Sequence, residues 1–205
     1  MITLELLQAI NDWQAKGYGA NKIKLVEKLK EESKCLSDDF KILQRPCYRR
    51  LDLEKDATWK MGDELEISET YSSWTFDINV AKDIWPIPEL QELKTPIIGE
   101  LKPNDPNYKV ILNLNDLFRD SSFLLAIESN KDKIVGYTDG IGQFLNNEQE
   151  VVIECKKIKI NQVVGYGGHS KLGFGTDWVT EKDAIERLIN GHISTTQNLK
   201  RKYNK

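Results

Sequence analysis

The stretch Asn147–Cys155 reads NEQEVVIEC and places two glutamates directly ahead of an apolar run. The run Val151–Ile153 consists of β-branched residues, which are typical of a buried strand. One residue separates Glu148 from Glu150, and side chains two apart in a strand point to the same face. The stretch therefore predicts a buried strand that begins with a pair of neighbouring carboxylates.

Neighbouring carboxylates suit a particular kind of chemistry. Each raises the pKa of the other, because two like charges oppose ionisation. One carboxylate can stabilise a cationic sugar centre while the other handles the proton of an acceptor, in parallel with glycoside cleavage. A Glu-x-Glu at a strand start is also typical of an ordinary solvated strand end, since charges are mostly exposed. Further residues are needed before the pair indicates a site.

A second polar feature lies in the segment Pro46–Leu51, which reads PCYRRL and predicts a strand over 47–53. An arginine in such a strand is unfavourable unless its guanidinium meets an anion. The planar guanidinium group suits a pyrophosphate or a carboxylate. Arg49 and Arg50 compete for this role, because strand alternation points them to opposite faces.

The third feature is the segment Tyr71–Thr75, which reads YSSWT. Strand alternation puts Ser73 and Thr75 on one face. By itself the segment is typical of a capped turn into the following helix, with Thr75 or Asp77 as the cap. The segment therefore indicates a functional site only in combination with the other two segments.

Composition excludes several classes of protein. The 205 residues carry 29 Lys+Arg and 32 Asp+Glu, with 40% hydrophobic and 30% charged residues, which predicts a globular chain without a strongly basic nucleic-acid-binding surface. No apolar run approaches the ~20 residues of a membrane span. The acidic, amphipathic start MITLELLQAINDW argues against a cleaved secretion signal.

Cysteine and histidine usage predicts a cytoplasmic protein without a metal. The three cysteines are widely spaced and form no CxxC, which fits a reducing compartment. The two histidines, His169 and His192, are not spaced like zinc ligands.

The order of hydrophobic patterns predicts an α+β fold. Helical spacing of apolar residues, beginning with the stripe Leu4, Leu7, Ile10 and Trp13, fills positions 1–45, and a short helix follows at 78–85. Five of the six prolines lie in 86–107, which predicts an irregular segment. Strand-like runs lie at 47–53, 109–114, 123–127, 134–137, 150–155 and 158–164, an alternating pattern lies at 64–67, and a second strand signal leads into Tyr71. A mobile glycine-rich loop at 165–175, a helix capped by Thr180 and a basic tail complete the chain. Segregated helices and strands indicate a mainly antiparallel or mixed sheet.

The three segments together resemble the mono-ADP-ribosyltransferases of the Arg-Ser-Glu class, the cholera-toxin-like and clostridial-toxin-like group. The family's aromatic-Arg, Ser-Thr-Ser and Glu-x-Glu motifs match Tyr48-Arg49, Ser73-Trp74-Thr75 and Glu148-Gln149-Glu150. The resemblance covers about residues 46–160. Trp74 stands where the family has threonine, and Arg50 stands where many members have glycine.

The resemblance implies a fold with two small, mainly antiparallel sheets that form an NAD cleft. N-terminal helices precede the sheets and one C-terminal helix follows them. It also implies a single ADP-ribosyltransferase domain over 1–205. Residues 1–45 would form the N-terminal helices, 46–165 the catalytic core, and 166–205 the glycine-rich loop, last helix and basic tail.

For NAD binding, the resemblance implies that Arg49, preceded by Tyr48, holds a phosphate of the pyrophosphate. Ser73, Trp74 and Thr75 would line the same binding site. The aromatic residue that packs on nicotinamide in the family has no single counterpart here, and the candidates are Trp74, Phe76 and Trp85.

For catalysis, the resemblance implies that Ser73 orients Glu150, and that Glu150 binds the ribose and stabilises the oxocarbenium ion as nicotinamide leaves. Glu148 would polarise or deprotonate the acceptor, and Glu-x-Glu goes with guanidino acceptors in the family. A protein arginine is therefore the default acceptor. The segment 140–147 would be the acceptor loop, with Phe144 as its only aromatic.

Other interpretations remain open. The same chemistry on RNA or DNA would fit the lysines at 156, 157 and 159 and the basic tail. A catalytically inactive NAD-binding or interaction module would need no intact Arg, Ser and Glu-x-Glu set. The setting is an intracellular toxin, a phage-encoded modifier or a delivered effector, and a toxin would imply an antitoxin or inhibitor as a partner.

Overall fold

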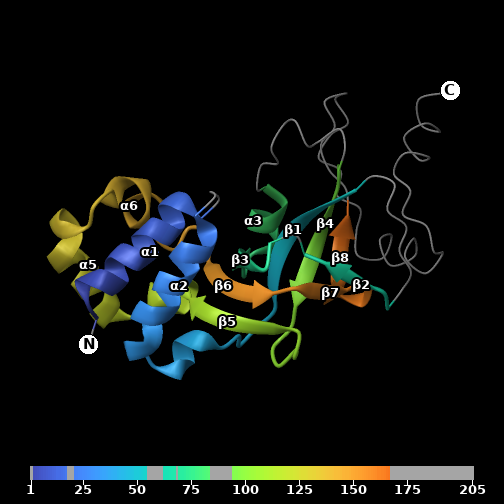
Figure 1. Cartoon of the computed structure of the whole chain (residues 1–205), viewed down its shortest axis with the longest axis horizontal. Coiled ribbons are helices and arrows are strands. Elements are labelled where there is room, and N and C mark those ends of the chain that lie inside the picture. Colours follow the sequence, from blue (N-terminus) through green and yellow to red (C-terminus); the bar gives the residue numbers. More distant parts are fainter. Residues whose placement is uncertain (1, 18–20, 55–61, 68, 84–93, 167–205) are drawn as a thin grey trace. The chain divides into compact units, whose positions relative to one another are not determined.

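The computed structural model describes residues 2–17, 21–54, 62–67, 69–83 and 94–166 (Figure 1). The chain divides into two compact units. The first comprises 1–47, 69–77 and 102–155, and the second comprises 48–68, 78–101 and 156–205. Helices and strands occur in both units, so the structure mixes helix and sheet and is compatible with the predicted α+β class.

In the first unit three antiparallel strands run in the order β5-β6-β3. Their bounds are β3 Tyr71–Thr75, β5 Tyr108–Asn113 and β6 Glu150–Cys155. In the register of β3 and β6, Thr75 lies opposite Glu150 and Tyr71 opposite Glu154. β6 has a neighbour on each side, and all its side chains except Glu154 are buried. This burial explains the continuous apolar run that the sequence places there.

The helices of the first unit supply the rest of its core. They are α1 Leu4–Lys16, α2 Lys22–Glu32, α4 Leu114–Leu117, α5 Ser121–Asn130 and α6 Ile141–Phe144, with 3₁₀ turns at Ser33–Cys35, Asp38–Lys41, Lys131–Lys133 and Tyr137–Asp139. The Thr3 hydroxyl caps α1 by accepting from the Leu6 amide at 3.1 Å. Of the apolar stripe predicted for α1, Leu7, Ile10 and Trp13 are buried and Leu4 is half-buried, while Leu6 adds a further buried side chain. This stripe joins β6 and α5 in one hydrophobic cluster.

Polar contacts also attach α2 to the strands of the first unit. The Lys30 ammonium lies 2.8 Å from the Glu154 carboxylate of β6. It also lies 4.4 Å from the centre of the Tyr71 ring of β3, a cation–π distance.

Two strands expected from the sequence are wrong. The run 123–127 belongs to α5, because the Asp120 carboxylate caps a helix by accepting from the Phe123 amide at 2.9 Å. Phe123 and Ile127 are buried at helical spacing, while Leu125 between them is exposed. The run 134–137 is also not a strand: Ile134 follows a 3₁₀ turn and Gly136 has a φ of 70°.

These corrections change the predicted segregation of helices and strands. Three helices, α4, α5 and α6, lie between β5 and β6 in the chain. The sequence pattern had assigned this region to strands, because short runs of Ile, Leu and Phe suit either structure.

The second unit contains a three-strand set and a separate pair. The set has the order β1-β4-β8, with β1 Cys47–Glu54, β4 Lys94–Leu101 and β8 Val163–Tyr166. The pair consists of β2 Glu64–Glu66 and β7 Lys157–Lys159, with Leu65 opposite Ile158. The helix α3 covers Ile78–Asp83, and a 3₁₀ turn at Ile160–Gln162 divides the predicted strand 158–164 into β7 and β8.

β4 corrects the prediction that 86–107 is irregular throughout. Ile97, Ile98 and Leu101 are almost fully buried in this strand. Pro96 precedes the first β4 residue paired with β8, which is Ile97, so its missing N–H removes no bond of that ladder. The predicted loop beyond residue 166, the last helix, the basic tail, both histidines and Trp85 lie outside the described residues.

Gly140 allows α6 to approach α1 closely. A Cβ at this position would lie 2.5 Å from the backbone and the side-chain oxygens of Asn11. The Asn11 side-chain oxygen accepts from the Ile141 amide at 2.9 Å, and its amide group donates to the carbonyls of Val135 and Gly136. We expect Gly140→Ala to destabilise the protein by about 1–3 kcal/mol, because these contacts must open.

Urea unfolding at equilibrium measures this prediction. The control is Gln143→Ala, in the same helix but at an exposed position, which should change the free energy of unfolding by less than about 0.5 kcal/mol. Equal unfolding midpoints for the two variants would contradict the close approach.

Candidate functional site

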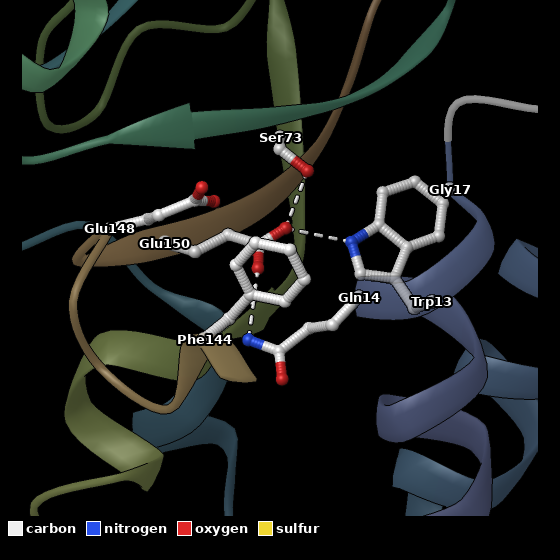
Figure 2. Close-up of a pocket in the computed structure, with 7 residues that line it drawn as sticks. All are labelled: Trp13, Gln14, Gly17, Ser73, Phe144, Glu148 and Glu150. Atoms are coloured by element: carbon white, nitrogen blue, oxygen red, sulfur yellow. Dashed lines mark hydrogen bonds between the residues drawn. The ribbon is translucent and has the colours of Figure 1, made fainter. Parts of the chain in front are cut away.

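A pocket of the first unit collects the carboxylates that the sequence singled out. It is lined by residues from α1 and its C-terminal end, from β3 and α6, and from the start of β6 and the segment before it: Trp13, Gln14, Gly17, Ser73, Phe144, Glu148 and Glu150 (Figure 2). Four of these, Ser73, Phe144, Glu148 and Glu150, are predicted site residues. The structure therefore brings together residues that are distant in the sequence.

Glu150 is the centre of the hydrogen-bond network in this pocket. It is the first residue of β6 and only 5% exposed. Its Oε1 atom accepts from the Ser73 hydroxyl and from the Trp13 indole Nε1, the latter at 2.8 Å. Its Oε2 atom accepts from the Gln14 amide at 3.4 Å (Figure 2). A buried carboxylate thus receives three donors from two different elements.

Strand alternation in β3 points Ser73 toward Glu150. Ser72 and Trp74 are buried on the other face, where the Trp74 indole donates to the Ser72 hydroxyl at 3.0 Å. Trp74, expected from the resemblance to contact NAD, thus does not line the carboxylate pocket. The Trp74 side chain therefore packs in the protein core.

Thr75 links the end of β3 to the segment that carries Glu148. Its hydroxyl donates to the Glu148 carbonyl at 2.6 Å and accepts from the Asp77 amide at 3.0 Å. Thr75 therefore makes the expected capping hydrogen bond, in a turn at the end of the strand. The same side chain fixes the backbone of the Glu-x-Glu segment, although it does not line the pocket.

Glu148 reaches the pocket by a different route from the one predicted. It lies in a turn before β6, and Gln149 has a φ of 46°, in the left-handed region. Simple strand alternation therefore does not put Glu148 and Glu150 on one side. The turn does so instead, and both carboxylates line the same pocket.

Burial governs the ionisation of both carboxylates. It raises the pKa of Glu150, while hydrogen bonds from Ser73, Trp13 and Gln14 and the positive charge of Lys22 lower it. Burial also raises the pKa of Glu148, and the nearby charge of Glu150 raises it further. Both groups therefore hold protons more tightly than ordinary glutamates.

The raised pKa of Glu148 predicts a pH-dependent stability. Between the ordinary glutamate pKa and the raised pKa, the folded state binds more protons than the unfolded state, so stability falls as pH rises through this window. Glu148→Gln removes the charge, and we expect it to raise Tm by about 2–4 °C at pH 8. The difference from wild type should shrink toward zero at pH 4, where the glutamate is mostly protonated in both states.

Thermal unfolding at pH 4, 6 and 8 checks this expectation. Glu27→Gln, at an exposed position of α2, is the control for loss of one negative charge from the surface. A Glu148→Gln protein with a lower Tm than wild type at pH 8 would contradict the assigned burial of the carboxylate.

Phe144 ends α6 and lies half-buried beside the carboxylates. After it the backbone turns sharply at Leu145, which has a φ of 42°, and the Leu145 carbonyl accepts from the Gln14 amide at 3.3 Å. The predicted acceptor loop 140–147 is therefore a short helix and a turn that reach the pocket (Figure 2).

Tyr48 and Arg49 lie on β1, where both side chains are half-buried. They belong to the second unit, whereas the pocket residues belong to the first, and the contact of Arg49 with NAD stays a prediction. Arg50 is buried, and its Nε donates to the Asp52 carboxylate at 3.0 Å.

Sequence reasoning missed Trp13 and Gln14. The sequence places Trp13 only in the apolar stripe of α1, and the residue is indeed only 2% exposed. A buried tryptophan N–H usually finds an acceptor, so its placement was a signal that a polar partner exists. The partner lies 137 residues away in the chain, and no local pattern identifies it.

Among the described residues, no cluster of three or more His, Cys, Asp or Glu side chains could hold a metal ion. None of the helices in that part of the chain is long and apolar enough to cross a membrane. No protein-family model, curated protein or solved structure matches the chain. Function must therefore be inferred from the pocket's own chemistry.

Proposed function

We propose that the protein is a mono-ADP-ribosyltransferase that moves ADP-ribose from NAD to a macromolecular acceptor, by default a protein arginine. The observation that carries this proposal is the hydrogen bond from Ser73 to Glu150, with Glu148 in the same pocket. The Ser and Glu-x-Glu motifs were matched to the family from sequence alone, and they are 77 residues apart. Their convergence supports the motif match.

Glu150 has the features required of a group that stabilises a cationic sugar. It is buried and oriented by donors, so its charge acts in a medium where electrostatic interactions are strong. As the bond from the ribose carbon to nicotinamide breaks, positive charge develops on that ribose. The fixed carboxylate favours this state over the ground state, in which the positive charge lies on the nicotinamide ring.

Glu148 has the features of a general base for the acceptor. It is half-buried beside Phe144 and its pKa is raised, toward the range in which a base works near neutral pH. A guanidino nitrogen of the acceptor forms the new bond to the ribose carbon, and its proton passes to Glu148. Nicotinamide leaves with the electron pair of the broken bond.

The remaining assignments extend the proposal to the rest of NAD. Arg49 would bind a pyrophosphate oxygen, and Tyr48 would lie next to it on β1. Phe144 would contact the acceptor. NAD acts here as a substrate, and this chemistry needs no metal ion.

Incubation of the purified protein with NAD labelled in its adenylate phosphate tests the proposal. We expect nicotinamide release, together with transfer of label to total protein in a form that protease removes. Label on total RNA or DNA, removed by nuclease, would instead identify a nucleic-acid acceptor. If neither release nor label appears while NAD raises Tm, the protein is an inactive NAD-binding module and the proposal is wrong.

A further inference from the structure

The two oxygens of the Glu150 carboxylate are held unequally. Oε1 accepts from both Ser73 and Trp13, whereas Oε2 accepts only the longer bond from Gln14 at 3.4 Å. An ionised carboxylate offers about four acceptor positions. Within the described part of the chain, the position left over is therefore on Oε2.

We infer that Trp13 is a positioning residue that anchors Oε1 of Glu150 together with Ser73, so that Oε2 is the oxygen presented to the substrate. The identity of that substrate, the nicotinamide ribose with its hydroxyl donors, rests on the proposed function. The anchoring itself rests on the geometry of α1, β3 and β6.

The placement of Trp13 makes it a rigid donor. Its helix is fixed in the core by Leu6, Leu7 and Ile10, which are fully buried. The indole is itself buried, and the Lys22 ammonium lies 5.9 Å from the ring centre. A donor held in this way fixes the rotamer of the carboxylate, which a hydroxyl such as Ser73 alone does less firmly because it rotates.

The hydrogen bond from Trp13 must be distinguished from the influence of nearby charges on Glu150. Glu148 shares the pocket, and the charge of Glu150 raises the pKa of Glu148. Lys22 favours ionisation, but its ammonium lies 2.7 Å from the Glu69 carboxylate. The contribution of Trp13 is a directed hydrogen bond, so removing its N–H while keeping an aromatic ring isolates it.

Trp13→Phe is the first test. Loss of a hydrogen bond to a charged group should lower kcat for nicotinamide release by roughly 10–100-fold at neutral pH. KM for NAD should change little, and the acidic limb of the pH profile should move to higher pH, because the ionised carboxylate loses a donor. Gln14→Met removes the longer bond to Glu150, together with the bond to the Leu145 carbonyl, and should have a smaller effect on kcat and on the pH profile.

Tyr71→Phe is the matched control. It also removes one polar group from a partly buried aromatic of the first unit, but its hydroxyl accepts from Lys30 rather than contacting Glu150. We expect it to leave the pH profile unchanged. If Trp13→Phe folds and gives the same kcat and pH profile as Tyr71→Phe, the positioning role is wrong.

A second measurement does not depend on transferase activity. In ¹⁵N NMR spectra, the Trp13 indole N–H resonance is identified as the one that Trp13→Phe removes. This resonance should shift with pH as Glu150 titrates. The shift should disappear in Glu150→Gln. An indole that titrates in a protein without any NAD activity would leave the anchoring intact and refute the proposed function. An indole that does not titrate in an active enzyme would refute the anchoring alone.

Discussion

Glu150→Gln is expected to lower the rate of ADP-ribosyl transfer by about 10²–10³-fold, the loss that accompanies removal of one preorganised electrostatic group. The amide keeps the size of the side chain and can still accept from Ser73 and Trp13 through its oxygen. It cannot supply the negative charge that faces the developing cation. Initial rates of nicotinamide release and label transfer at saturating NAD measure the loss.

Unfolding does not explain such a loss. Burial raises the pKa of Glu150, so the ionised group is destabilising at neutral pH, and the neutral amide should not lower Tm there. Glu154→Gln is the control: it makes the same change on the same strand, at the residue paired with Lys30. Transfer by Glu150→Gln at a rate near wild type would overturn the catalytic assignment.

The fold could be predicted from sequence where local signals agree with tertiary packing. The apolar stripe of α1 and the run of β6 each have one consistent period, and both were predicted correctly. The segment of α5 is ambiguous because Phe123–Ile127 is apolar at every position, so periodicity does not distinguish strand from helix. The Asp120 cap favours the helix, and the apolar run alone does not contain this signal.

The candidate site could be predicted only where a motif exists. Ser73 and Glu150 belong to recognisable segments, and the register of β3 with β6 brings them together. The donors on α1 belong to no motif. Trp13 meets Glu150 only because α1 packs against the strands, which is a tertiary fact that a local pattern does not contain.

The geometry of Glu148 shows the same limit on a smaller scale. The spacing of the two glutamates predicts that they share one face of a strand. They do line the same pocket, but a shared strand face is not the reason. The left-handed backbone at Gln149 places Glu148 in a turn. A glutamine in the sequence does not predict such a conformation, because positive φ favours glycine, asparagine and aspartate.

Glu148→Gln is expected to separate transfer from hydrolysis of NAD. Transfer to arginine should fall by about 10²-fold or more, because the guanidinium is protonated near neutral pH and becomes a nucleophile only as a base removes a proton. Water needs no such step before it captures an oxocarbenium ion, since its proton can leave to solvent afterwards. Slow NAD hydrolysis should therefore persist in the variant, and the ratio of label transferred to nicotinamide released measures the separation.

The same substitution distinguishes a chemical role from a structural one. Glu148→Gln should be at least as stable as wild type at pH 8, because it removes a charge whose pKa is raised by burial, so reduced transfer cannot be attributed to unfolding. Glu154→Gln again serves as the control, with the ratio of transfer to hydrolysis unchanged. Equal loss of both activities in Glu148→Gln would point to a defect in NAD binding, and Glu148 would then not be the base. A selective loss of transfer would assign the two carboxylates of one pocket to two different steps, with Glu150 acting on the ribose and Glu148 on the acceptor.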